Sequence, residues 1–332
     1  MTLPVSDRVR IRAAAETAIR AYFAARSVLE VSVPCLVQTP AMEAHLVGIE
    51  ATPRYAHIGR RFLHTSPEFA IKATFSELDA DVFTLARSFR DEPLTRWHHV
   101  EFTMLEWYRR GGLDLLYCDV AALHDQVCDA VAQTLGVPSP PQCSFKTTRL
   151  ADAFQSTCDV DILVADQATL LASCRDAGID VRDEWDWDTL FTVLYAECVE
   201  PSLATQQPEF VTHFPASQAA LARLDPDDSR QALRFEAYVR TTSGPVELAN
   251  AFAELTDSAE QRARFEHDQH TRAQASLEVY PMPEAMLKGI TQMPITSGIA
   301  LGVERLLVYA TERLTGEQLT VRDFLLGEPT HA

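Results

Sequence analysis

Eight ionisable side chains lie close together within the stretch FTLARSFRDEPLTRWHHVEFTMLEWYR, which spans residues 83–109. They are Arg87, Arg90, Asp91, Glu92, Arg96, His98, His99 and Glu101. Apolar and aromatic residues flank them on both sides, and this pattern predicts two strands joined by a long charged turn. The alternative is a solvated turn whose ion pairs contribute little to stability.

Such a hairpin could present Arg90 and Glu92 from one edge. A guanidinium group suits a phosphate because it offers several hydrogen-bond donors in one plane. The Glu92 carboxylate could accept a hydrogen bond from an amine such as the adenine amino group, and Phe102 could offer its aromatic face to a base. The chemistry indicated by the hairpin is therefore nucleotide binding.

A second set of residues lies in VELANAFAEL, residues 246–255, where Glu247 and Glu254 interrupt an apolar strand. Buried carboxylates are costly unless they are paired or bind a metal, and two of them suit Mg²⁺ that shares substrate phosphates. Residues seven positions apart lie on opposite faces of a regular strand. A bulge or a break is therefore required, and we expect it near Asn250 and Ala251. Alternatively, both carboxylates lie at an edge and face solvent.

The segment SGIALGVERLL, residues 297–307, predicts a strand, a turn and a helix. Gly298 and Gly302 would let a ligand approach the backbone closely. Arg305, in the first helical turn, could point back toward the same ligand. The glycine spacing alone is equally consistent with ordinary packing, and HTSPEFAIK, residues 64–72, is a weaker candidate still.

These candidate residues need a framework that positions them. Residues 6–26 predict a helix that Ser6 could cap, and VLEVSVP predicts a strand that ends at Pro34. The pattern then predicts strands within 54–72 and 82–109, a helix over 119–135 and a break at 137–142.

The remaining segments continue this framework. Residues 145–205 are helical in pattern, and strand patterns return in EFVTHFP, RFEAYVR and PVELANAFAEL. A polar helix begins near Asp257, where Glu260 completes a pattern typical of a capping box. The strand SGIALG and a final helix follow. We therefore predict an α+β fold, in which helices flank one antiparallel sheet and a helical insertion occupies about residues 119–205.

Composition narrows the classes of function. The 332 residues are 47% hydrophobic and 23% charged, as in ordinary folded proteins. No apolar run approaches the ~18 residues of a membrane span, and the N-terminus lacks a signal-peptide pattern, so we expect a cytoplasmic location. Seven cysteines without a C-x-x-C pair argue against a disulfide framework or a zinc ribbon. The net charge of −18 disfavours extensive binding to nucleic-acid phosphates.

The order of the segments resembles the class II aminoacyl-tRNA synthetases. RSFRDE with EFTMLEWY is similar to their motif 2, SGIALGVERL to motif 3, and VLEVSVP to motif 1, the usual dimer element. TSPE and ELANAFAEL narrow the resemblance to the lysyl branch, over about residues 5–325. Ala300 replaces a glycine that lysyl-tRNA synthetases usually have. Together with the expected lack of an anticodon-binding barrel, this is typical of the elongation factor P–lysine ligases, which attach β-lysine to a lysine of that factor.

The resemblance implies one catalytic domain over residues 1–332, ATP and Mg²⁺ as cofactors, and a role for each motif residue. Arg90 would hold the α-phosphate and Arg305 the γ-phosphate, as the two catalytic residues. Further ATP contacts would come from Asp91, Glu92, His99, Phe102, Glu247, Leu248 and Gly302. Mg²⁺ would be bound by Glu247 and Glu254. The amino-acid pocket, suited to two ammonium groups, would be lined by Ser66, Pro67, Glu68, Tyr108, Asn250, Glu254 and Ala300.

The expected partners are elongation factor P, β-lysine or lysine, and a second copy of the chain in a homodimer, but not tRNA or a membrane. Three positions depart from the family pattern: His99 replaces an asparagine, Ala251 a glycine, and Ala253 a polar residue. ATP binding is therefore better supported than the identity of the amino acid. The alternatives are a ligase for another amino acid or acceptor, an enzyme that charges tRNA, and a synthetase-like binding protein without turnover. Because the phosphate and metal residues occur together, a pure binding protein is disfavoured.

Overall fold

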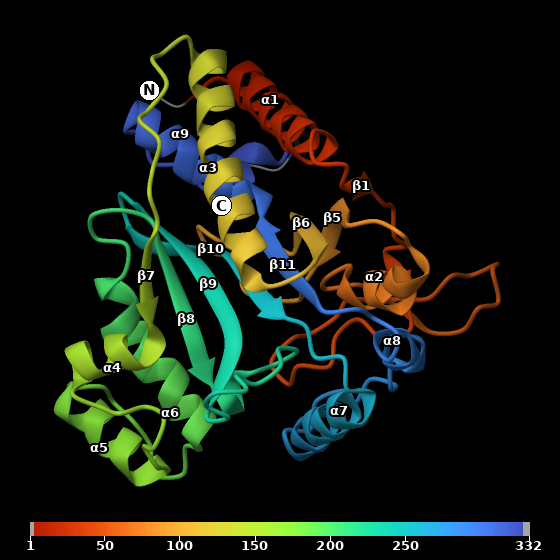
Figure 1. Ribbon diagram of the computed structural model, residues 1–332, viewed down its shortest axis with the longest axis vertical. Helices are drawn as coiled ribbons and strands as arrows, with labels where there is room; N and C mark the ends of the chain where they lie inside the picture. The colour runs from red at the N-terminus through yellow and green to blue at the C-terminus, as the bar shows by residue number, and fades with distance from the viewer. Residues whose placement is uncertain (1–2, 328–332) are drawn as a thin grey trace. The chain divides into compact units, whose positions relative to one another are not determined.

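The computed structural model describes residues 3–327 and divides into two compact units. One unit comprises residues 1–141 and 253–332, and the other comprises residues 142–252. Each unit combines strands with helices (Figure 1). The predicted α+β class is confirmed, although an edge pair of strands in each unit is parallel rather than antiparallel.

The first unit is built on four strands in the order β1 (Leu29–Glu30), β5 (Val82–Phe89), β6 (Glu101–Arg110) and β11 (Thr296–Gly302). β5 and β6 form the predicted hairpin and pair over the whole length of β5, from Val82 opposite Tyr108 to Phe89 opposite Glu101. β11 lies antiparallel to β6 on its other side. A small separate sheet has the order β2 (Leu36–Val37), β4 (Arg61–Leu63) and β3 (Glu50–Ala51).

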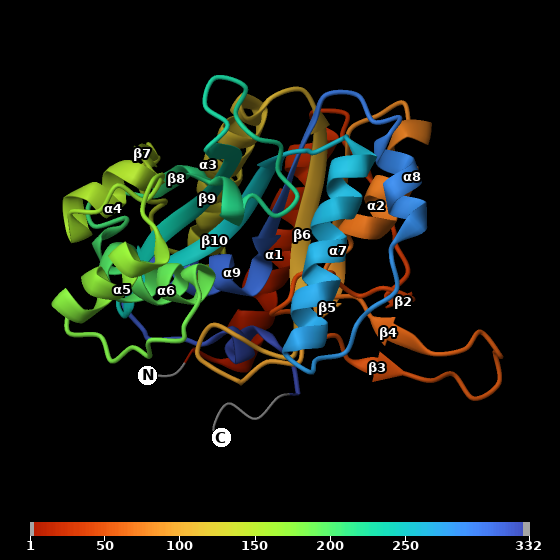
Figure 2. The same ribbon diagram turned by 90° about the horizontal axis from the view of Figure 1, so that it is seen from below.

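Helices pack on these strands. α1 (Val5–Ala24) and α3 (Leu113–Leu135) lie side by side, and α9 (Val303–Thr315) contacts both (Figure 1). Phe23 of α1 stacks on Phe83 of β5 with 4.4 Å between the ring centroids, so burial of the apolar face of α1 fixes it against the hairpin. α2 (Glu68–Thr74) packs against α8 (Glu284–Ile290), next to α7 (Ser258–Gln274) (Figure 2). Short 3₁₀ turns occur at Phe75–Glu77 and Val321–Phe324.

The second unit has four strands in the order β10 (Gly244–Ala253), β9 (Gln231–Thr241), β8 (Glu209–Pro215) and β7 (Lys146–Arg149). Its helices are α4 (Leu150–Cys158), α5 (Gln167–Asp176) and α6 (Trp187–Leu194), followed by helical turns at Tyr195–Val199, Glu200–Ser202 and Ala216–Gln218. Asp166 and Asp186 are the N-caps that precede α5 and α6, and their side chains accept from the backbone N–H groups of Thr169 and Thr189.

Several local predictions are confirmed, and others are wrong. Asp257 caps α7 as predicted, but α1 begins after Pro4 without a side-chain cap, so Ser6 is not its cap. The strand predicted for VLEVSVP is only two residues long, because Leu29 and Glu30 alone pair with β5. The segment 54–72, predicted as strand, contains only β4 and then becomes helix α2.

Two predicted absences can be compared with the described residues. Within residues 3–327 no helix is long and apolar enough to cross a membrane. All seven cysteines lie in this range, and each is a free thiol.

Candidate active site

The hairpin places Arg90 and Phe102 next to each other. The Arg90 backbone N–H donates to the Val100 carbonyl at 3.0 Å, which closes the hairpin directly after β5. The Arg90 guanidinium carbon lies 5.3 Å from the centroid of the Phe102 ring. Asp91 is exposed and Glu92 is half-buried. A guanidinium group and an aromatic face thus occur at the same end of the hairpin.

Arg305 reaches the turn of the same hairpin from the start of α9. Gly302 is the residue that precedes the first turn of this helix. The Arg305 guanidinium donates to His98 Nε2 at 2.8 Å, and its Nε lies 3.4 Å from the Trp97 carbonyl. His98 must therefore be unprotonated at Nε2 in this contact. The structure brings the second predicted catalytic arginine to the loop that follows Arg90.

His99, which replaces the expected asparagine, is buried within the hairpin. Its Nδ1 lies 2.8 Å from the Glu101 carbonyl and 3.2 Å from the Glu101 N–H. One ring nitrogen is therefore engaged by the backbone of the hairpin itself. The predicted contact of His99 with ATP would have to use the other nitrogen, Nε2.

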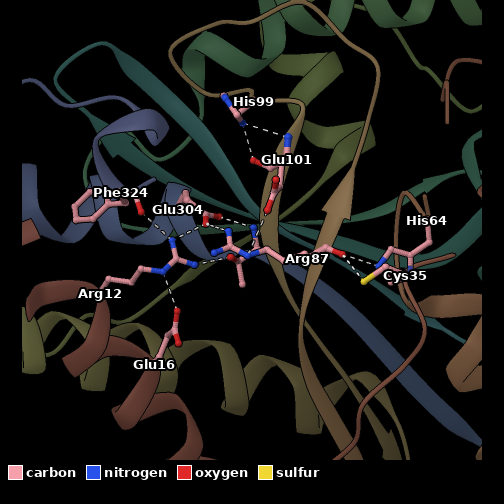
Figure 3. Close-up of polar contacts among 10 residues, drawn as sticks. Arg12, Glu16, Cys35, His64, Arg87, His99, Glu101, Glu304 and Phe324 are labelled. Carbon is pink, nitrogen blue, oxygen red and sulfur yellow. Dashed lines mark hydrogen bonds and ion pairs between the residues drawn. The ribbon is translucent and has the colours of Figure 1, made fainter. Parts of the chain in front are cut away.

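A buried carboxylate, Glu304, ties the hairpin to α9 (Figure 3). Glu304 is 2% exposed and accepts from the backbone N–H of Thr103 at 2.8 Å. It also pairs with Arg12 of α1 at 2.8 Å and with Arg87 of β5 at 3.8 Å (Figure 3). Arg12 in turn donates to Glu16 and to the Phe324 carbonyl. The network therefore holds Arg305, one residue after Glu304, at a fixed place beside the hairpin.

A second set of buried charges lies around α2. Lys72 is fully buried, and its Nζ lies 2.5 Å from Glu68 Oε1, one helical turn away. Lys72 also forms an ion pair with Glu254, which follows β10. The Glu254 backbone N–H donates to the Thr296 carbonyl at 3.0 Å, so this residue is fixed beside the start of β11. Glu68 and Glu254, predicted from different segments, thus meet at one cation.

Glu106 of β6 belongs to the same buried set. Its two carboxylate oxygens accept from the hydroxyls of Ser66 at 2.8 Å and Tyr108 at 2.6 Å. Burial, together with the charge of Glu68, raises the pKa of Glu106 to about 8. Burial also raises the pKa of Glu254 to about 7, against the lowering effect of Lys72. Burial therefore favours the protonated forms of Glu106 and Glu254, whereas a cation beside them favours the ionised forms.

The register of β11 against β6 shapes the space beside these carboxylates. Gly298 lies opposite Tyr108, and Ala300 lies opposite Glu106. A side chain at Gly298 would collide with Glu254 Oε1 and with the Tyr108 ring. Glycine therefore lets the Glu254 carboxylate and the Tyr108 ring pack directly against the backbone of β11. Pro67, buried, precedes the first turn of α2. The unit thus brings six of the seven predicted pocket residues into this region: Ser66, Pro67, Glu68, Tyr108, Glu254 and Ala300.

The seventh, Asn250, belongs to the second unit together with Glu247 and Leu248. The Asn250 side-chain oxygen accepts from Arg234 Nε at 3.1 Å. The pairing of β10 with β9 shifts register between Glu247 and Ala249, which leaves Leu248 as the extra residue. The irregularity required by the odd spacing of the two glutamates therefore exists, but it lies before Asn250 rather than at Asn250 and Ala251.

The same unit holds another carboxylate near Glu247. Glu236 of β9 accepts from Tyr238 at 2.7 Å and from Arg234 at 2.5 Å. Burial raises the pKa of Glu236 to about 7, Arg234 opposes this shift, and the charge of Glu247 adds to it. The carboxylates of Glu236 and Glu247 are therefore close enough to interact.

Three residues of these clusters were missed by sequence reasoning: Lys72, Glu106 and Glu236. Each had a recognisable pattern in the sequence. Lys72 follows Glu68 by four positions, the spacing of a helical ion pair. Glu106 and Glu236 interrupt apolar strands in the same manner as Glu247.

Comparison with known proteins identifies the class to which this site belongs. The family model of the class II tRNA synthetases (D, K and N) matches residues 2–315. The chain therefore belongs to the class II tRNA synthetases. It is 40% identical over 323 residues to the elongation factor P–(R)-β-lysine ligase of Edwardsiella ictaluri, covering 96% of this chain and 94% of that protein. It is also 40% identical over 317 residues to the elongation factor P–(R)-β-lysine ligase of Erwinia tasmaniensis, covering 93% of this chain and 91% of that protein.

Proposed function

We propose that this protein is an ATP-dependent ligase that activates (R)-β-lysine, or lysine, and transfers it to a lysine side chain of elongation factor P. The observation that carries this proposal is the buried set of Glu68, Glu106 and Glu254 beside the glycine-lined start of β11. A substrate with two ammonium groups supplies the positive charge that such carboxylates need. The 40% identity to two ligases of this name supports the choice of substrate and acceptor.

The proposed reaction has two steps. The substrate carboxylate attacks the α-phosphorus of ATP, pyrophosphate leaves, and the acceptor amine then displaces AMP from the acyl carbon. Arg90 would stabilise the charge that develops on the α-phosphate, and Arg305 would hold the γ-phosphate end. Phe102 would stack on the adenine, and Glu92 would accept from its amino group. Catalysis of this kind relies on positioning and on preorganised charge rather than on a side-chain nucleophile.

Mg²⁺ would supply additional neutralisation of the phosphates. The proposed ligands are Glu247 and Glu254, because the bulge at Leu248 removes the objection that a regular strand would separate them. Glu254, however, is also engaged by Lys72. Glu236 interacts with Glu247 and is therefore a second candidate partner for Glu247 in metal binding. Leu248 would contribute its backbone to ATP, and Asn250 would reach the amino acid.

The oligomeric state, the acceptor and the cellular location are also part of the proposal. We propose a homodimer, a protein acceptor rather than tRNA, and a reaction in the cytoplasm, where a translation factor would be modified. The net charge of −18 supports a protein acceptor, because tRNA binding usually requires a basic surface.

Parallel transfer assays test the acceptor. The enzyme, ATP and labelled (R)-β-lysine are offered elongation factor P in one reaction and tRNA in another. We expect label on elongation factor P, lost when its acceptor lysine is replaced by arginine. Label on tRNA alone would reject the proposed acceptor, and transfer of a different amino acid would identify a related ligase with a shifted substrate.

A further inference from the structure

Lys72 is unusual among the basic residues of this chain. The chain has 29 lysines and arginines, and only Lys72, Lys146 and Lys288 are lysines. Lys72 is 0% exposed, and both of its ion-pair partners, Glu68 and Glu254, belong to the proposed amino-acid pocket. A buried ammonium is costly unless carboxylates surround it. Lys72 therefore occupies a cation position inside the pocket itself.

Lys72 forms an ion pair with only one carboxylate oxygen of each partner. It contacts Glu68 through Oε1 and Glu254 through Oε2. Glu254 Oε1 is buried and has no hydrogen-bond partner among residues 3–327. That same oxygen packs against the backbone of Gly298, where a Cβ would collide with it. One oxygen of Glu254 is thus committed to Lys72, and the other is left to accept from a donor that these residues do not supply.

We propose that Lys72 is a positioning residue, a fixed internal counter-cation that limits the pocket to substrates with two ammonium groups. This inference rests on the proposed function. When all of them are ionised, the net charge of the cluster is −2, from the three carboxylates of Glu68, Glu106 and Glu254 and the one ammonium of Lys72. Two substrate ammonium groups balance that charge.

The geometry also gives Lys72 a role in placing the substrate. If its ammonium were absent, a substrate ammonium could occupy the position between Glu68 and Glu254. The substrate would then bind in the wrong register, with its carboxylate displaced from the α-phosphate. Since displacement by about 1 Å can cost about 100-fold in rate, Lys72 would act on the productive placement of the amino acid and not on ATP.

The test compares Lys72→Ala and Lys72→Arg with the control Lys288→Ala, whose side chain is exposed. Amino-acid-dependent pyrophosphate exchange is measured with (R)-β-lysine, with and without methylammonium. For Lys72→Ala we expect kcat/KM for the amino acid to fall at least about tenfold, as for the loss of a positioning contact, while the KM for ATP stays unchanged. Methylammonium should restore part of the loss in this variant only, and Lys72→Arg should retain more activity than Lys72→Ala.

A second readout does not depend on activity. Methylammonium should raise the melting temperature of Lys72→Ala, because it refills the cation position, but not that of the wild type or of Lys288→Ala. If Lys72→Ala keeps normal kcat/KM, or if methylammonium changes neither its activity nor its melting temperature, the inference is wrong. If the wild type activates no diamino acid, the proposed function fails, and the melting temperatures still decide whether Lys72 fills a replaceable cation position.

Discussion

Lys72 and Glu254 form an ion pair in which each side chain is only 1% exposed. Glu106, a carboxylate of the same cluster, is also buried, at 2% exposed. Burial consequently raises the pKa of Glu254 to about 7 and that of Glu106 to about 8. A cationic substrate beside these carboxyl groups would favour their ionised forms.

The first prediction concerns the pH dependence of substrate binding. Raised pKa values mean that Glu106 and Glu254 ionise as the pH rises through about 7 to 8. The KM for the diamino acid should therefore fall as the pH rises from 6 toward 8, by up to about tenfold per pH unit for each proton that binding must release. The KM for ATP should change much less over the same range. A KM for the amino acid that rises with pH would contradict the assignment of these carboxylates to the pocket.

The second prediction concerns stability without ligand. The pKa of Glu106 is about 8 in the folded protein and about 4.5 for the ordinary group, so the folded state binds the extra proton between these values. Stability should therefore fall as pH rises through this window, by up to about 1.4 kcal/mol per pH unit for one proton. Glu106→Gln should flatten that decline in urea unfolding series at pH 5, 6, 7 and 8. An unchanged slope would show that Glu106 does not titrate in this window.

The third prediction concerns the two glycines of motif 3. A Cβ at Gly298 would collide with Glu254 and Tyr108, whereas at Gly302 it would lie 3.4 Å from Arg305 Cδ. Gly298→Ala should therefore lower kcat/KM for the amino acid by about tenfold or more, as expected when a positioning contact is displaced. Gly302→Ala should mainly change the KM for ATP. If both substitutions changed kcat/KM for the amino acid and the KM for ATP to the same extent, Gly298 and Gly302 could not be assigned to separate amino-acid and ATP sites.

Much of this arrangement could be predicted from local patterns, and the reasons for the failures are physical. The β5–β6 hairpin and α9 follow directly from alternation and helical periodicity. Helix α2 was missed because HTSPEFAIK is short and begins directly after a strand, so its pattern is ambiguous. The odd spacing of Glu247 and Glu254 predicts a bulge between them but does not say at which residue. The bulge occurs at Leu248. Lys72 was missed because its second partner, Glu254, is distant in sequence and meets it only in the folded chain.

The fourth prediction concerns the network around Glu304. Glu304→Ala leaves Arg12 and the Thr103 N–H without this buried carboxylate, and should lower the free energy of unfolding by about 2–4 kcal/mol. Glu101→Gln is the matched control, because it removes an exposed carboxylate 3.7 Å from Arg87, and it should cost about 0–1 kcal/mol. Urea unfolding at constant pH measures both. Similar losses of unfolding free energy in the two variants would show that the contacts of Glu304 stabilise the fold no more than an exposed ion pair does.

The fifth prediction concerns Arg90. Arg90→Ala removes a preorganised cation from the proposed α-phosphate position, and loss of one such donor costs about 100–1000-fold in rate. Pyrophosphate exchange under saturating ATP measures the loss in kcat. Thermal unfolding checks that the variant is folded. Near-normal exchange by a folded Arg90→Ala enzyme would be incompatible with the role assigned to motif 2.

The central claim is that the hairpin, α9 and the buried carboxylates together activate a diamino acid with ATP. Amino-acid-dependent ATP–pyrophosphate exchange, run with (R)-β-lysine, lysine and the other common amino acids, tests it most directly. We predict exchange with (R)-β-lysine, weaker or no exchange with lysine, and none with amino acids that carry a single ammonium group. Exchange only with a monoamino acid, or no exchange with any amino acid tested, would contradict the claim.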